Sequence, residues 1–121
     1  SNQFKDRYNA VLSAQDAAIS SVKCGMTGED VDRIARDVID SLGFQGKFSH
    51  GLGHGIGLNI HETPMIVPGS KDILRENMVF TIEPGIYFSN WGGIRLEDVV
   101  VLENNRARVL TRTPKIMEKF T

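Results

Sequence analysis

A short glycine-rich segment around the histidines most constrains what this chain can fold into. Residues 46–57 hold five of the 12 glycines, and the three histidines are His50, His54 and His61. Each glycine in a helix costs about 1 kcal/mol relative to alanine, so this segment argues against a helix. In an extended chain the even offset between His50 and His54 places both rings on one side. The glycines beside them let a ligand or another backbone approach closely.

Two better-known motifs do not fit this segment. A dinucleotide fingerprint needs a third glycine where Ile56 follows Gly51 and Gly53. A helical zinc motif needs a second histidine three residues after His61-Glu62, but a threonine and a proline come first, and proline disrupts a helix. Histidine supplies metal ligands or carries protons near neutral pH, so both of these uses stay open, as does ordinary packing.

Two helices are predicted before the glycine-rich segment. Apolar residues recur at three- and four-residue steps over residues 3–22, which indicates an amphipathic helix with Gly25 as its C-cap. Thr27 has the character of the next N-cap, with Asp30 as its acidic partner. A second apolar stripe follows and ends at Gly43. We expect both stripes to pack into a core.

Strands are predicted after the glycine-rich segment. Residues 78–82 and 94–102 are rich in β-branched and aliphatic residues, and the start of the second run alternates apolar with charged residues. Residues 104–105 are a pair of asparagines typical of a turn, so 107–110 can return as a hairpin partner. Two helices followed by antiparallel strands predict one α+β domain over residues 1–121.

Charge and cysteine content narrow the class of partner. The 14 Lys and Arg residues nearly balance the 15 Asp and Glu residues, and a net charge of −1 gives no reason to expect nucleic acid or an anionic membrane. Apolar runs are too short to span a bilayer, so no membrane association is expected. The single cysteine, Cys24, excludes an internal disulfide and suits a reducing, cytoplasmic location.

Two glutamates in the strand region need partners. Glu83 follows a predicted strand, and Glu97 lies inside the next one. An ionised carboxylate is expensive to bury alone. Arg95, two residues from Glu97 on the same face, could neutralise it in an ordinary ion pair. A metal would also serve, because one imidazole with several carboxylates suits Mn²⁺, Co²⁺, Fe²⁺ or Zn²⁺. Two such ions sharing carboxylates would hold and activate a water molecule.

Three ordered blocks resemble a known family. Residues 50–62 (HGLGHGIGLNIHE), 81–87 (TIEPGIY) and 93–98 (GIRLED) are similar to the creatinase/aminopeptidase, or pita-bread, metallopeptidases. Within that family the resemblance is to Xaa-Pro dipeptidases (prolidases) and aminopeptidase P. Methionine aminopeptidases share the first two blocks, and the third favours the proline-specific branch. The resemblance therefore implies half of a pita-bread fold and hydrolysis of the peptide bond before proline.

The resemblance also implies a metal set. His54, Glu83 and Glu97 would be ligands, with Glu97 bridging two divalent ions that hold the attacking hydroxide. Mn²⁺ or Co²⁺ is expected, with Zn²⁺ or Fe²⁺ as alternatives. His50 and His61 would contact the scissile carbonyl and steady the tetrahedral intermediate.

Two further catalytic roles follow from the same resemblance. Glu83 would accept the proton of the attacking water, and Arg95 would orient Glu97.

The resemblance further implies that part of the site lies elsewhere. Two of the family's five ligands are aspartates that precede the first helix, and no aspartate here matches their motifs. We therefore expect the C-terminal half of a catalytic domain that binds one metal ion or none and has little peptidase activity alone. Its expected partners are a proline-containing peptide, the missing N-terminal half and a second copy of the chain. The alternatives are a non-catalytic pita-bread binding module and a methionine-aminopeptidase-like enzyme.

Overall fold

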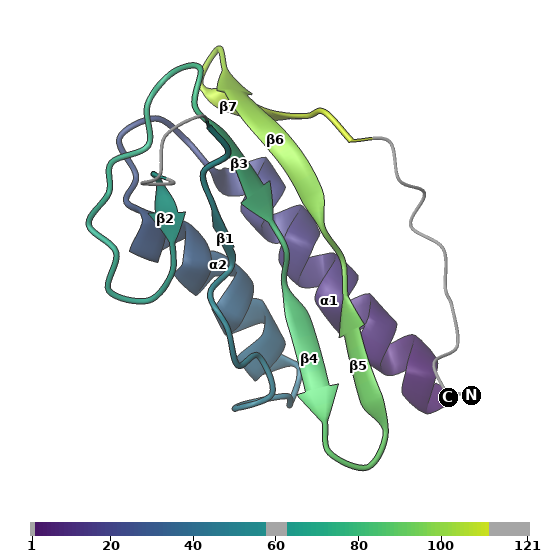
Figure 1. Cartoon of the computed structure of the whole chain (residues 1–121). Coiled ribbons are helices and arrows are strands. Elements are labelled where there is room, and N and C mark those ends of the chain that lie inside the picture. The colour runs from purple at the N-terminus through teal and green to yellow at the C-terminus, as the bar shows by residue number, and fades with distance from the viewer. Residues whose placement is uncertain (1, 58–62, 112–121) are drawn as a thin grey trace.

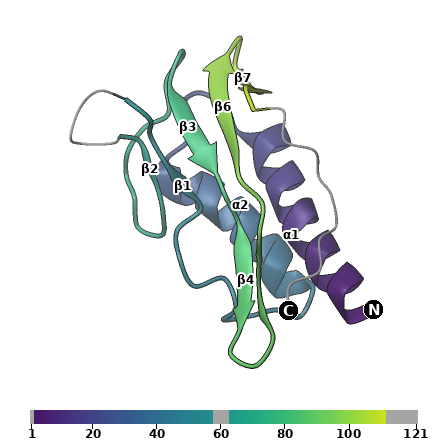
Figure 2. The ribbon, with the colours of Figure 1, turned by 45° about the vertical axis from the view of Figure 1, so that its right-hand side comes forward.

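The structure of the chain, a computed structural model, describes residues 2–57 and 63–111. Helices α1 (Asn2–Ser21) and α2 (Gly28–Ser41) lie side by side on one side of a layer of antiparallel strands (Figure 1). The same arrangement is visible after a turn of 45° (Figure 2). The α+β prediction is confirmed. No helix within the described ranges is both long and apolar enough to cross a membrane.

Local capping explains where the second helix begins. The Thr27 hydroxyl accepts a hydrogen bond from the Asp30 amide at 3.1 Å, and the Asp30 carboxylate accepts one from the Thr27 amide at 2.9 Å. This reciprocal cap confirms the prediction, and the backbone hydrogen bond from Thr27 lowers the pKa of Asp30. The prediction for Gly25 was wrong. Helix α1 ends at Ser21, and Gly25, with φ 91°, lies in the following turn and donates to Leu74 O at 2.8 Å.

The strands are short and antiparallel. Strand β1 pairs with β2, β6 lies between β3 and β7, and β4 pairs with β5. The β6–β7 turn confirms the predicted hairpin, because Asn104 and Asn105 both have the positive φ of its tight turn, 53° and 61°. The strand bounds are β1 Gly53–His54, β2 Met65–Ile66, β3 Val79–Ile82, β4 Gly85–Phe88, β5 Gly92–Arg95, β6 Asp98–Glu103 and β7 Arg106–Val109.

A break divides the strand that was predicted over residues 94–102. It falls at Leu96 and Glu97, between β5 and β6, and a matching break separates β3 from β4. Glu97 therefore lies outside a strand, contrary to the prediction. The pairing register nevertheless continues, since Ile82 pairs with Asp98 on one side of the break and Gly85 with Arg95 on the other. We call these four strands the long ladder, in which β3 leads into β4 and β5 into β6 across the break (Figure 1).

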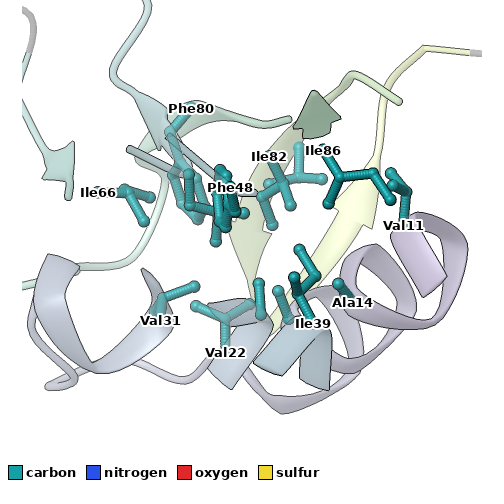
Figure 3. Close-up of a cluster of buried hydrophobic side chains, with 14 of the residues drawn as sticks. Val11, Ala14, Val22, Val31, Ile39, Phe48, Ile66, Phe80, Ile82 and Ile86 are labelled. Carbon is teal, nitrogen blue, oxygen red and sulfur yellow. The ribbon is translucent and has the colours of Figure 1, made fainter. Parts of the chain in front are cut away.

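The core fills the space between this ladder and the helices (Figure 3). Alternate ladder residues point into it, and burying each large aliphatic side chain contributes about 1.5–3 kcal/mol. One polar side chain also lies there. The amide of Gln15, on α1, is fully buried and donates to Ile82 O at 3.2 Å, directly before the break. Fully buried or nearly buried members of the cluster include Val11, Ala14, Val22, Val31, Ile39, Phe48, Ile66, Phe80, Ile82 and Ile86.

Candidate functional site

Four of the candidate residues line one hollow in the surface. It has a volume of about 380 Å³ and lies where β1 passes the break in the long ladder. His50 and His54 both line it. The chain bends at His50 and Leu52 and is extended at Gly53 and His54, so the prediction of an extended segment holds for its second part. The lining residues are His50, Gly51, Gly53, His54, Met65, Val67, Glu83 and Arg95.

The glycines bring this segment against neighbouring backbone. A Cβ on Gly53 would collide with the carbonyl oxygen of Thr81, and one on Gly55 would collide with that of Thr63. The close approach lets the His54 amide donate to the Thr81 hydroxyl at 3.0 Å. The absence of a side chain at Gly53 therefore lets the histidine segment pack directly against β3, which agrees with the prediction that the glycines allow another backbone to approach closely.

His54 presents one ring nitrogen to Glu83. Its Nδ1 lies 3.0 Å from the carbonyl oxygen of Gly55. A carbonyl only accepts, so Nδ1 carries the proton and Nε2 of the neutral ring carries the lone pair. Nε2 lies 3.7 Å from Glu83 Oε2. Metal bonds of about 2.0–2.2 Å to nitrogen and oxygen leave two ligand atoms of one ion about 3–4 Å apart. These two side chains therefore fit neighbouring ligands of one cation.

Glu83 and Glu97 stand opposite each other at the break, because the ladder register continues through it. Leu96 N donates to Pro84 O at 3.2 Å, which keeps the two chains paired there. Their exposure differs, since the Glu83 side chain is 16% exposed and that of Glu97 is 46% exposed. Glu97 is not among the residues that line the hollow. Its Oε1 lies 4.0 Å from Arg95 Nε, a long and half-exposed ion pair that contributes little to stability.

The structure does not assemble the whole expected set. Over residues 2–57 and 63–111, no three His, Cys, Asp or Glu side chains are grouped so that they could hold a metal ion together. His54 and Glu83 lie together, whereas Glu97 turns toward Arg95. His61 lies outside the described residues. The two-donor arrangement fits a partial site for a divalent cation.

Tyr87 is a site residue that sequence reasoning did not single out. Its hydroxyl lies 2.7 Å from His50 Nε2, while His50 Nδ1 lies 2.7 Å from Gly51 O. Because the carbonyl needs the Nδ1 proton, the tyrosine hydroxyl donates to Nε2 of the neutral ring. The ring lies over Gly85 and Gly93, where any Cβ would collide with it.

The position of Tyr87 could have been found from strand alternation. It follows Glu83 by four residues and so falls on the same face of the strand. Burial raises the pKa of Tyr87, the nearby Arg95 guanidinium acts in the opposite direction, and the Glu83 carboxylate adds to the increase. The hydroxyl therefore stays protonated and keeps its proton for His50.

Comparison with known proteins agrees with this geometry. The model of metallopeptidase family M24 matches residues 1–104. The Xaa-Pro dipeptidase of Pyrococcus furiosus is 46% identical over 111 residues, which are 92% of this chain and 32% of that protein. The structure of an Xaa-Pro dipeptidase from Bacillus anthracis superposes with a TM-score of 0.91 at 40% identity, over 97% of this chain and 33% of that one. An X-Pro aminopeptidase from Thermotoga maritima gives 0.89 at 43% identity, over 96% and 33%.

The match of the family model over residues 1–104 places the chain in the class of metallopeptidases. This chain is a member of metallopeptidase family M24, and the family implies divalent metal ions. The chain spans about a third of the length of the relatives it matches.

Proposed function

We propose that this chain supplies His54, Glu83 and Glu97 to the two-metal centre of an Xaa-Pro peptidase. The remaining ligands come from a part of the enzyme that precedes the two helices. Support comes from membership of family M24 and from relatives named Xaa-Pro dipeptidase that share this stretch. The chain is the C-terminal part of the catalytic domain in this proposal, and alone it binds one metal ion or none.

The opposed glutamates are the single observation that carries the proposal. The strand register runs from the Ile82–Asp98 pair to the Gly85–Arg95 pair, so it brings Glu83 and Glu97 to matching positions of the break between them. A divalent cation bound there would attract both carboxylates, and His54 Nε2, 3.7 Å from Glu83 Oε2, would complete its near side. When bound, the ions supply electrophilic activation of a water molecule and of the substrate carbonyl.

The other site residues have roles that follow from their contacts. His50 lines the hollow and has the role of contacting the scissile carbonyl in this proposal. Tyr87 orients His50 through the 2.7 Å hydrogen bond. Arg95 restrains Glu97. Glu83, beside the hollow, accepts the proton of the attacking water, and His61 adds a second contact to the substrate.

The substrate of this site is a peptide with proline after the scissile bond. Mn²⁺ or Co²⁺ suits its imidazole and carboxylate donors, with Zn²⁺ or Fe²⁺ as weaker candidates. Dipeptides are the favoured substrates, because several of the similar proteins are named Xaa-Pro dipeptidase. Another similar structure is that of an X-Pro aminopeptidase from Thermotoga maritima, so longer Xaa-Pro peptides are the alternative substrates. The protein works in the cytoplasm in this proposal.

The edge of the sheet is where the rest of the enzyme, or a second copy of the chain, would pack. Val109 and Leu110, at the end of β7, are 41% and 42% exposed. Exposed strand edges pair readily with other chains. Light scattering of the isolated chain is expected to detect a homodimer, and a strictly monomeric chain at high concentration would contradict self-association.

A chimeric enzyme provides the direct test of function. The matching third of the Pyrococcus furiosus Xaa-Pro dipeptidase would be replaced by this chain, which is 46% identical to it. We expect hydrolysis of an Xaa-Pro dipeptide that depends on added Mn²⁺ or Co²⁺. Glu83→Gln and Glu97→Gln should each lower kcat/KM at least about 100-fold, the range seen when preorganised charges are removed from a site.

Glu103→Gln is the matched control, because Glu103 is a carboxylate on the same ladder that pairs with Arg108 at 2.7 Å and lies away from the hollow. Its activity should equal that of the unsubstituted chimera. A folded chimera that binds Co²⁺ but hydrolyses no Xaa-Pro peptide would remove the substrate assignment. A folded chimera that binds no metal would contradict the assignment of His54, Glu83 and Glu97 as ligands. The chain would then be better explained as a non-catalytic binding module.

A further inference from the structure

Helix α2 carries two ion pairs of the same type in very different surroundings. Glu29–Arg33 and Asp32–Arg36 both join residues four apart on the helix. The side chains of Arg33 and Glu29 are 58% and 40% exposed, whereas those of Arg36 and Asp32 are 26% and 2% exposed. An exposed pair of this spacing contributes little to stability. A buried carboxylate has a large desolvation penalty, so its position needs another explanation.

Arg36 uses its whole guanidinium group. Nε and Nη2 donate to the two carboxylate oxygens of Asp32 at 2.8 and 3.0 Å. Nη1 donates to Phe48 O at 2.7 Å, and Nη2 also donates to His50 O at 2.9 Å. The guanidinium carbon lies 4.1 Å from the centre of the Phe48 ring. A planar five-donor group is required for this set of contacts, and a lysine ammonium could not reproduce it.

Asp32 bonds to the main chain of the same segment, residues 48–52, on the other side of His50. Its Oδ2 accepts a hydrogen bond from the Leu52 amide at 3.0 Å. The pair therefore binds main-chain groups of Phe48, His50 and Leu52, on both sides of the His50 side chain. Every hydrogen bond that the pair makes to this loop goes to a main-chain group and none to the His50 ring.

We propose that Asp32 and Arg36 form a positioning unit that fixes the main chain on either side of His50 and so aims the His50 ring at the hollow. Phe48 packs edge-on against that ring, with the ring centres 5.1 Å apart, and Tyr87 donates to it from the opposite strand. Because the main chain on both sides of it is held, the His50 ring accepts the Tyr87 hydrogen bond without a change of backbone conformation. Such precise placement of a contacting group is worth large factors in rate.

This inference deepens the proposed function and rests on it only for the use to which His50 is put. The clamp itself is a property of the chain, so it can be measured without any peptidase assay. Failure of the chimeric enzyme would leave the clamp standing, whereas failure of the clamp would leave the metal ligands and the substrate assignment untouched.

The primary test is Arg36→Lys in the 121-residue chain, followed by isotope-edited NMR. Arg36→Lys removes the guanidinium that holds the Asp32 carboxylate in place, so the hydrogen bond from the Leu52 amide to Asp32 should loosen. Exchange of the Leu52 amide should then be about 10- to 100-fold faster, the factor expected when a hydrogen bond to a charged group is lost. The His50 ring signals should move toward those of an unrestrained histidine. In the chimera, kcat should fall about tenfold with the affinity for Co²⁺ unchanged.

Arg33→Lys is the matched control, since it alters the same kind of pair on the same helix at the exposed site. It should leave the Leu52 amide and the His50 ring unchanged. The inference is overturned if Arg36→Lys leaves both reporters at their original values, or if the two variants change them equally. If Arg36→Lys does not fold, Asp32→Asn, which keeps the side-chain shape, decides the question by the same two reporters.

Discussion

The two faces of the long ladder are built from alternate residues of the same strands, yet they are organised in different ways. Ile82, Ile86 and Ile94 face the helices and are 0–2% exposed. Glu83 and Tyr87, their neighbours in sequence, are half-buried and face the hollow or the residues around it. The covered face is continuous across the break, whereas the other face carries its carboxylates at the break itself.

This difference separates what stabilises the chain from what the chain can do. The covered face gains free energy from removing apolar surface from water. The site face gains little, since its ion pairs are long or exposed. Substitutions on the covered face should therefore act on stability, and those on the site face on binding.

The largest effect is expected on the covered face. Ile82→Ala should lower the free energy of unfolding by about 2–5 kcal/mol, because a fully buried side chain is lost and leaves a cavity. Denaturant unfolding followed by circular dichroism measures the change. Arg95→Gln, on the site face, is the comparison and should stay within about 0.5 kcal/mol. Equal losses in the two variants would break the distinction between the faces.

The contact between the histidine segment and β3 should be the next most sensitive feature. Gly53→Ala places a Cβ on the carbonyl oxygen of Thr81, so we expect a loss of about 1–3 kcal/mol and displaced His54 signals in NMR spectra. Gly57→Ala is the control, since none of the residues that the structure describes lies within 4 Å of the added Cβ there. A Gly53→Ala chain as stable as the Gly57→Ala chain would show that close backbone packing is not required.

On the site face, Glu83→Gln should act only when metal is present. Without metal the free energy of unfolding should change by less than about 0.5 kcal/mol, because the contact that Glu83 makes with His54 is long, at 3.7 Å. With Co²⁺ the substitution should abolish any rise in Tm that the ion gives the unsubstituted chain, because binding to the folded state alone is what raises Tm. Thermal unfolding with and without Co²⁺ tests both. An equal rise in Tm with Co²⁺ in the two chains would contradict the role of Glu83 as a ligand.

Local sequence signals predicted much of the fold. The Thr27–Asp30 cap, the apolar stripes of both helices and the Asn104–Asn105 turn each involve residues only a few positions apart. Alternation of apolar and charged residues also predicted that Arg95 and Glu97 share one side of the chain, which agrees with their ion pair of 4.0 Å. These features depend on the chain's own periodicity, which a sequence displays directly.

The remaining features depend on contacts between distant segments. The break at Glu97 follows from how β5 and β6 pair with β4 and β3, and alternation does not mark it. Gly25 looked like a helix cap, but its amide bonds to Leu74. The sequence does not distinguish Asp32 from the other helical aspartates, because the Leu52 amide that donates to it is 20 residues away. Such partners become visible only when the helices are packed on the ladder.

The smallest expected effect is a pH dependence at Tyr87. Burial of its hydroxyl raises the folded-state pKa above the ordinary value of 10.0, with Arg95 opposing and Glu83 adding to the shift. Tyr87 therefore contributes stability that is fully present below about pH 10 and is lost as pH rises through the folded-state pKa. Because water screens the half-buried ring, the slope should be shallow. Unfolding measured at several alkaline pH values should show a shallower slope for Tyr87→Phe than for the unsubstituted chain.

Tyr8 supplies the contrast needed to interpret that slope. Its pKa is also raised, first by burial and then by Asp16, but it lies in the core on α1. Tyr8→Phe should remove its own part of the alkaline loss and leave the His50 ring signals unchanged, whereas Tyr87→Phe should move them, because only Tyr87 donates to His50. Identical His50 signals in the two variants would mean that the hydrogen bond does not orient the ring.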